Sequence, residues 1–306
     1  MRVLEKTVCV KLSCTVWTGC RRMRPEDLGR LAARLPPGEL ASMGSLKLCD
    51  PAELRELAAI RRRAKHACER LAVKFLGGYA TDEANLDRIV SALNEFKAQF
   101  DAAASRVVSG LQGMIDQWAD AHPEWEEAIR RCPPDVSRIA SQLKFDFQVF
   151  RIAAPADGDA PANDGLERAV SGLSRQLYRE IAVQARSALR RSFEGKGSVG
   201  QQAVRVITVI AEKLDALSYL DGGIRPALDK VRSVRDTLPK TGRITGRELV
   251  DVMGLLSLLG NEDRLAQLAT VKVAANGAPD GPGDTNGAGA VQPRPQEDAG
   301  GTPLYF

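Results

Sequence analysis

The sequence predicts a mainly α-helical protein, a long helical hairpin or bundle of coiled-coil type with a small two-stranded β element and a disordered C-terminal tail. Three patterns predict this: apolar residues recur every three or four positions through most of the chain, two short segments alternate with period two, and residues 276–303 almost lack apolar side chains. We expect a helical domain over 1–270, strands at about 7–17 and 143–152, and a Gly/Pro-rich tail over 271–306.

Composition limits the function classes. The 306 residues are 44% hydrophobic and 27% charged, which is enough for one large core or two modest ones. A net charge of +4 is small for this length, so a whole-protein field that attracts nucleic acid is not expected, although a local basic patch could still do so.

Cysteine and histidine usage argues against a metal site. No CxxC pair occurs and the chain has only two histidines, so the four clustered ligands of tetrahedral zinc are not available. We expect the cysteines to be small apolar residues in a reducing compartment. They are Cys9, Cys14, Cys20, Cys49, Cys68 and Cys132.

The N-terminal residues do not predict a signal peptide, because Glu5, Lys6 and Lys11 interrupt the stretch that would have to be apolar. No apolar run approaches the roughly 20 residues that span a bilayer. We therefore expect a cytoplasmic protein without a membrane partner and without a cofactor.

Two segments predict β-strands. In residues 7–17 the side chains alternate between apolar and polar up to Trp17, and the same alternation recurs from Leu143 to Val149. A lone strand leaves its backbone groups unpaired, so we expect these two strands to pair with each other. The pattern does not distinguish an antiparallel from a parallel pair.

Helix start signals follow the first strand. Asp50 before Pro51 is typical of an N-cap and first helical residue, and this helix should end at Gly77-Gly78. A second start at Asp82 opens a periodic run to residue 120, a helix about 58 Å long at 1.5 Å per residue. Such a helix normally packs on another long helix. A short acidic helix should follow Pro123.

The second half of the chain predicts the partners of that helix. Residues 166–193 are periodic after an aperiodic loop over 153–165, and Ser198 is expected to cap another helix that ends near Leu217. We expect both to form a hairpin with the helix over 82–120. Shorter helices are expected at about 225–238 and 247–259.

One glycine-rich segment is similar to a phosphate-binding loop but fails its requirements. In Gly195-Lys196-Gly197-Ser198 the residue after the lysine is glycine rather than serine or threonine. Arg190 stands where the first glycine should be, and a helix rather than a strand precedes the segment. Nucleotide binding is therefore not expected here.

His122 and Glu126 lie one helical turn apart and could share a proton or a metal ion. A third ligand is missing and Pro123 lies between them, so a surface histidine at a helix end is the preferred interpretation. With two histidines in the chain, no Ser-His-Asp or Cys-His set is indicated. We expect a protein that is not an enzyme.

The most distinctive feature is a stripe of arginines on the helix over 166–193. Their spacing of 7, 4, 7 and 4 places them within about 60° of one another and over about 33 Å. The arginine stripe consists of Arg168, Arg175, Arg179, Arg186 and Arg190. It predicts contact with an anionic partner, either a nucleic-acid backbone or an acidic protein face. The alternatives are a solvated face without a partner, or arginines paired with acids of a neighbouring helix. Such acids include Glu83, Asp87, Glu95 and Asp101.

Several short segments together resemble a bacterial family, domain of unknown function 3150, over about residues 5 to 240. They are Trp17-Thr18-Gly19, Pro25 to Gly29, Met43 to Leu48 before Asp50-Pro51, and Phe145-Asp146-Phe147. The resemblance brings no catalytic residues. It implies a product of a phage, plasmid or other mobile element, encoded near a MoxR-type AAA+ ATPase and a von Willebrand A-domain protein.

These observations lead to one expected function and two rivals. The first is a non-enzymatic structural or adaptor protein whose helical hairpin binds a protein partner, such as an AAA+ ATPase or a von Willebrand A-domain protein. The alternative is a nucleic-acid-binding protein that uses the arginine stripe. An enzyme with an unrecognised site is the third.

Overall fold

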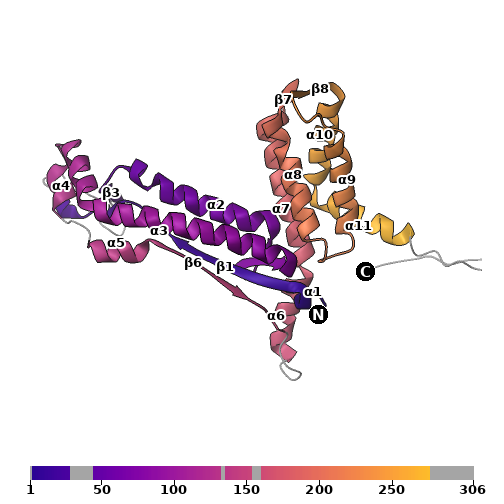
Figure 1. Ribbon diagram of the computed structural model, residues 1–306, viewed down its shortest axis with the longest axis horizontal. Coiled ribbons are helices and arrows are strands. Elements are labelled where there is room, and N and C mark those ends of the chain that lie inside the picture. The colour runs from indigo at the N-terminus through magenta and orange to yellow at the C-terminus, as the bar shows by residue number, and fades with distance from the viewer. Residues whose placement is uncertain (1, 28–43, 132–134, 154–159, 276–306) are drawn as a thin grey trace, which may run out of the picture.

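The structure, a computed structural model, describes residues 2–27, 44–131, 135–153 and 160–275 of the chain. Within these ranges the protein is mainly helical with three small antiparallel sheets, which confirms the predicted class. The elements form an elongated arm and a helical body that stands across one end of it (Figure 1). No helix in the described ranges is both long and apolar enough to cross a membrane.

The arm is built on a four-stranded antiparallel sheet in the order β4-β5-β1-β6. Its strands are β1 (Thr7–Thr15), β4 (Val73–Phe75), β5 (Gly78–Asp82) and β6 (Lys144–Phe150). The predicted pairing of β1 with β6 is confirmed and is antiparallel, with Cys9 opposite Phe150 and Thr15 opposite Lys144. The sheet has more than the two predicted strands because the β4–β5 hairpin, too short to show alternation, joins the other side of β1.

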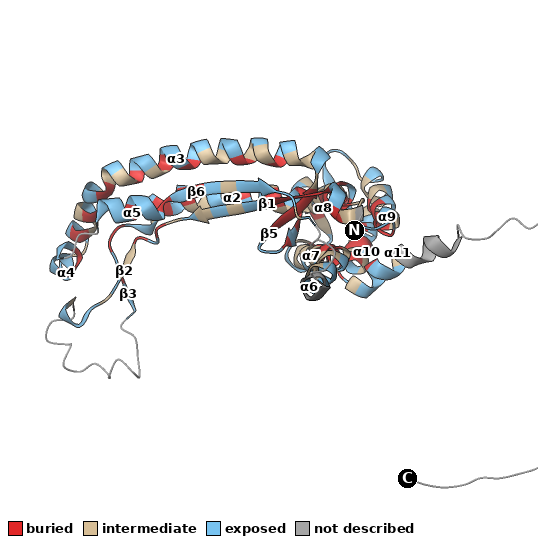
Figure 2. Cartoon of the chain, turned by 90° about the horizontal axis from the view of Figure 1, so that it is seen from below, coloured by how far each residue is buried: buried red, intermediate tan, exposed pale blue. Residues whose placement is uncertain are grey.

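Two helices pack along this sheet and along each other. A 3₁₀ turn, Pro51–Leu54, leads into α2 (Arg55–Leu71), and the Asp50 carboxylate accepts a hydrogen bond from the backbone N–H of Ala52. The 38-residue α3 (Glu83–Asp120) begins after Asp82, whose carboxylate accepts from the Asn85 N–H. Both predicted helix starts are thus confirmed. Figure 2 shows α3 along the arm with exposed residues outward and buried residues toward the sheet.

The coiled-coil hairpin between α3 and the helices after residue 166 is not confirmed. Instead α3 packs on α2 and on β6, where the rings of Phe100 and Phe145 lie 5.6 Å apart between centroids. The apolar face of α2, with Leu57, Ile60 and Ala64 fully buried, is the helical partner of α3. Helical periodicity indicates that a face is buried but does not indicate which other face covers it.

The far end of the arm, called the tip, contains four short elements. They are β2 (Cys20–Arg22), β3 (Ser45–Lys47), α4 (Glu126–Arg130) and α5 (Val136–Gln142). Helix α4 is the predicted acidic helix after Pro123. At the opposite end of β1 lies α1 (Arg2–Lys6), close to the body (Figure 1).

The body consists of helices and one small two-stranded antiparallel sheet. Its elements are α6 (Ala160–Ser171), α7 (Leu173–Ala188), a π-helical turn (Leu189–Phe193), β7 (Ser198–Gly200), α8 (Gln201–Ala216), α9 (Ile224–Asp236), β8 (Arg243–Thr245), α10 (Gly246–Leu259) and α11 (Glu262–Ala275). Helices α9 and α10 confirm the two shorter helices that the sequence predicts.

Three local expectations in this region are wrong. The single helix expected over 166–193 is divided at Gly172 and ends in a π-helical turn. It also begins earlier, at Ala160, because Pro161 is tolerated in a first turn, where its missing N–H has no partner to lose. Ser198 does not cap α8 but begins β7, which pairs with β8, and Gly200 occupies the N-cap.

Helix α11 extends through Ala275, into the start of the predicted tail. Residues 276–306 of that tail lie outside the described residues, as does Cys132. Among the described cysteines, which are all free thiols, Cys9, Cys49 and Cys68 are buried as expected. Burial raises the pKa of the Cys9 and Cys49 thiols to about 11 and that of Cys68 to about 12, so these thiols stay protonated near neutral pH.

Side chains protect the free edge of β6. The ammonium of Lys97 donates to the carbonyl of Phe145 at 3.1 Å, and the backbone N–H of Phe147 donates to the Asp146 carboxylate at 2.9 Å. An added strand would need these same two backbone groups. These two side-chain contacts therefore disfavour the pairing of another strand with this edge.

We expect Asp146→Ala to raise the mean mass of the protein at high concentration relative to the wild type. The substitution frees the Phe147 N–H at an edge that also exposes Val149 and Phe150. Size-exclusion chromatography with light scattering over a concentration series measures this. Gln148→Ala, an exposed residue of the same strand, is the control, and equal masses for both variants would contradict the role of Asp146.

Candidate functional site

The arginine stripe is exposed to solvent. Arg168 lies on α6, three members lie on α7 and Arg190 lies in the π-helical turn. All five residues are exposed. Among the described residues, none of the four acids of α3 proposed as partners forms an ion pair with an arginine of the stripe. Glu83 pairs with Arg151 at 2.8 Å and Asp101 pairs with Lys97 at 3.0 Å.

The corner between α10 and α11 crosses the stripe. Arg186 donates to the carbonyl of Gly260 at 2.6 Å, and Arg179 Nε lies 3.7 Å from a carboxylate oxygen of Glu262. A guanidinium on the last carbonyl of a helix satisfies an otherwise unpaired acceptor, so Arg186 holds α10 against α7. The stripe is therefore a basic face with a structural contact in its middle, and not one uninterrupted 33 Å surface.

Beside the stripe, a cleft of about 730 Å³ lies where the arm meets the body. We call it the junction cleft. Its walls come from α2, β4, α7 and α8, and Arg179 belongs both to the cleft and to the stripe. The basic residues that line it are His66, Arg70, Lys74, Arg179, Arg191 and Lys213. The sequence did not reveal this cleft, because its walls lie far apart along the chain.

A buried ion pair supports the wall of the junction cleft. The ammonium of Lys213 lies 2.7 Å from a carboxylate oxygen of Glu180 and donates to the backbone carbonyl of Glu69, also at 2.7 Å. The two side chains are 5% and 13% exposed. The other carboxylate oxygen of Glu180 accepts from the Lys74 N–H at 3.2 Å and from Gln176 Nε2 at 2.9 Å. These bonds connect α7 and α8 of the body to α2 and β4 of the arm.

Further cations of the cleft have carboxylate partners. Lys74 Nζ lies 3.6 Å from Glu69, and Arg70 pairs with Glu212, which raises the pKa of Arg70 and lowers that of Glu212 through their shared hydrogen bond. Arg191 donates to the Ser187 carbonyl of its own helix. Arg179 has the 3.7 Å contact with Glu262, but its side chain is 58% exposed, so Arg191 and Arg179 are the cations of the cleft that contribute least to holding arm and body together.

The cleft also has apolar lining residues. Val183 on α7 is 55% exposed, and Val209 of α8 lines the same space. Apolar contact surrounded by charged and polar groups is the usual composition of a protein-binding surface. His66 lies 3.6 Å from Glu69, and no group of three or more metal-ligating side chains occurs among the described residues. The arrangement is suited to binding anionic groups beside an apolar one.

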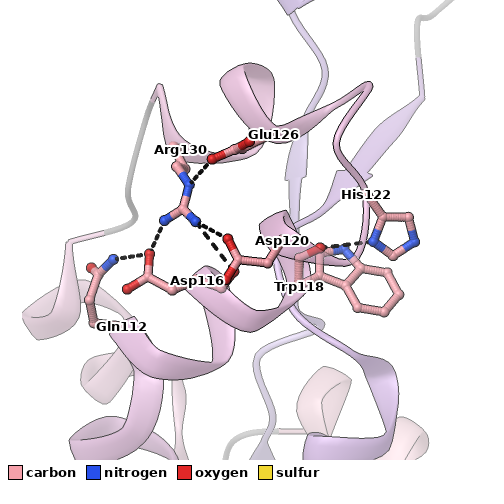
Figure 3. Close-up of polar contacts among 7 residues, drawn as sticks. All are labelled: Gln112, Asp116, Trp118, Asp120, His122, Glu126 and Arg130. Atoms are coloured by element: carbon pink, nitrogen blue, oxygen red, sulfur yellow. Dashed lines mark hydrogen bonds and ion pairs between the residues drawn. The ribbon is translucent and has the colours of Figure 1, made fainter.

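At the tip, one arginine ties α3 to α4 (Figure 3). Arg130 pairs with Asp116, with Asp120 at 2.5 Å and with Glu126 at 3.0 Å. Glu126 is thereby engaged by Arg130 rather than by His122. The half-buried His122 bonds through Nδ1 to the Trp118 carbonyl at 2.8 Å and stacks on the Trp118 ring at 4.1 Å, as expected for a histidine at a helix end.

A second anchor at the tip holds β2 against α4. Arg21 binds the Asp27 carboxylate through two hydrogen bonds of 2.6 and 2.7 Å and donates to the Ala128 carbonyl at 2.7 Å. The Arg21 hydrogen bond lowers the pKa of Asp27 to about 2, although desolvation acts in the opposite direction. Both anchors fix the orientation of the tip on the long helix.

Comparison with known families gives one match. The family model described as "Protein of unknown function (DUF3150)" matches residues 4–261, which includes the arm and the body through α10. The match extends beyond residue 240, where the sequence resemblance was expected to end. Neither the curated proteins nor the solved structures contain a match.

Proposed function

Because the chain belongs to the DUF3150 family of proteins of unknown function, whose name assigns no activity, we propose its role from geometry: a non-enzymatic adaptor that holds a protein partner at the base of a rigid arm. The observation that carries the proposal is the junction cleft, an exposed mixture of cations and valines formed jointly by arm and body. The partner that we propose to test first is a MoxR-type AAA+ ATPase, with a von Willebrand A-domain protein as the second.

The build of the arm supports an adaptor. An unbroken helix of 38 residues is about 57 Å long and packs on both α2 and the sheet. The tip is anchored by Arg130 and Arg21, and at the other end of the arm the Lys213–Glu180 pair connects α2 and β4 to the body. A structure fixed at both ends keeps surfaces on the tip and on the body at a constant separation, which is what a scaffold requires.

The adaptor proposal is tested by affinity purification of the tagged full-length chain from its native host, followed by reconstitution with purified candidates. We expect an ATPase or a von Willebrand A-domain protein to be recovered and to bind again as a purified protein. Recovery of neither, with the bait folded by circular dichroism, would reject the proposed partners. A bait with the Phe100→Ala substitution, which loosens the arm, tests whether partner binding requires a rigid arm.

Exposure of the arginine stripe also supports a second candidate, binding to a nucleic-acid backbone. Arg175 and Arg190 are the residues to change, since Arg186 holds α10 in place. If nucleic acid is the partner, the double variant with glutamate at both positions should abolish a salt-sensitive gel shift of a DNA duplex. No shift by the wild-type protein at low salt would exclude this candidate.

A further inference from the structure

We propose that the junction cleft binds an extended acidic segment of a protein, with one branched apolar residue between carboxylates. The inference rests on the proposed adaptor function and names the chemistry of the bound segment. It follows from the charged residues that line the cleft with Val183, from the spacing of residues along α7 and the turn after it, and from the two valines that line the cleft. None of these features depends on the identity of the partner.

The residues that α7 and the following π-helical turn present to the cleft determine the order of acidic and apolar side chains in the bound segment. Arg179 precedes Val183 by four residues, and Arg191 follows it by eight, all three along the same cleft. At 1.5 Å per residue the two arginines are separated by about 18 Å along the helix. An extended chain covers that distance in about five or six residues, with an apolar side chain over Val183 and a carboxylate toward each end.

The charges of the cleft favour an acidic occupant. Its lining carries five lysines and arginines but only two carboxylates, Glu69 and Glu180. Glu180 accepts a hydrogen bond from Lys213 and Glu69 is ion-paired with Lys74, so both carboxylates offer little to a basic ligand. Arg191 and Arg179 are exposed, long side chains that can turn toward an incoming carboxylate and bind it through two parallel hydrogen bonds, and Arg179 would exchange its 3.7 Å contact with Glu262 for that carboxylate.

The apolar residues that line the cleft favour a protein segment over nucleic acid as the occupant. Val183, which is 55% exposed, and Val209 of α8 both line the cleft. Binding of unpaired bases relies on aromatic side chains for stacking, and among the described residues the cleft has the His66 imidazole but no phenylalanine, tyrosine or tryptophan. An isoleucine or leucine side chain, by contrast, would remove apolar surface of Val183 and Val209 from water on binding.

The probe is a fluorescein-labelled peptide in which two acidic residues stand on each side of a single leucine. Anisotropy titrations use the full-length chain and two cleft variants, Val183→Asp and Arg191→Glu. The matched controls are Val250→Asp, a valine on α10 that is 66% exposed, and Arg247→Glu, an arginine on the same helix whose side chain is 94% exposed. Circular dichroism and thermal unfolding verify that every variant is folded.

We expect the wild-type chain to bind the peptide, each cleft variant to weaken binding at least tenfold, and the controls to change it less than twofold. Replacing the leucine by serine, or the acids by their amides, should weaken binding to a similar degree. The inference is overturned if the peptide does not bind, if cleft and control variants behave alike, or if an oligonucleotide competes fully and Val183→Asp has no effect.

Failure of the inference can be distinguished from failure of the adaptor proposal. A protein partner that binds the wild type and the Val183→Asp variant equally would leave an adaptor in place and exclude the cleft as its binding surface. A partner whose binding is lost in Val183→Asp and Arg191→Glu but kept in Val250→Asp and Arg247→Glu supports both.

Discussion

Replacing Lys213 with methionine is expected to lower the free energy of unfolding by about 3–5 kcal/mol. The substitution leaves the Glu180 carboxylate, 13% exposed, without the cation that neutralises it. It also removes the hydrogen bond to the Glu69 carbonyl, which joins α8 to α2 in addition to the Arg70–Glu212 pair. Urea unfolding followed by circular dichroism measures the loss.

A second variant separates the buried charge from the lost packing. Lys213→Met combined with Glu180→Gln makes the site neutral and keeps an acceptor for the Lys74 N–H and for Gln176. We expect the double variant to be more stable than Lys213→Met alone. The control is Glu83→Ala, which removes an exposed pair with Arg151 and should cost less than about 1 kcal/mol. A loss for Lys213→Met no larger than that control would contradict the role assigned to the pair.

Phe100→Ala is expected to destabilise the arm by about 3–5 kcal/mol. The ring is fully buried between α3 and the sheet and lies 5.6 Å from the Phe145 ring, so its removal leaves a cavity in a close-packed core. Hydrogen–deuterium exchange should show faster exchange in α3 and β6, with a smaller effect in α9 and α10 of the body. Urea unfolding gives the free energy.

The control for this prediction is Phe150→Ala. Phe150 lies at the end of β6 and is 38% exposed, so removing its ring creates no enclosed cavity. We expect it to cost at least 2 kcal/mol less than Phe100→Ala, in keeping with the dependence of such losses on residual cavity volume. Equal losses for the two phenylalanines would show that the arm is not held together by this contact.

Local patterns were sufficient where the structure depends on local interactions. Asp50 and Asp82 cap helices because a short carboxylate accepts from a nearby backbone N–H, and the signal lies within a few residues. The alternation on either side of Leu12 and Phe147 predicted two strands and their pairing. Strands of three residues, such as β4 and β7, are too short for alternation to show.

The candidate site was only partly predictable. The helical spacing of Arg175 and Arg179 predicted that they share one face of a helix but left open whether that face is exposed or paired with acids, and in the structure both side chains are exposed. Arg186, with the same spacing, proves to bind the Gly260 carbonyl of a helix 74 residues away. Lys213 was not identified, because a charged residue on an apolar face shows its role only when its partner is known.

The amino-acid sequence was enough to predict the helical class, the main helix starts, the pairing of β1 with β6 and the spacing of the five arginines along one helical face, since each follows from periodicity or from contacts near in the chain. The packing of α3 on α2, the solvent exposure of the arginine stripe and the meeting of Glu69, Glu180 and Lys213 in one cleft are known from the three-dimensional structure alone. The physical reason is that apolar burial is non-directional. An amphipathic face is stabilised by any complementary face, so the choice among partners depends on the packing of the whole chain.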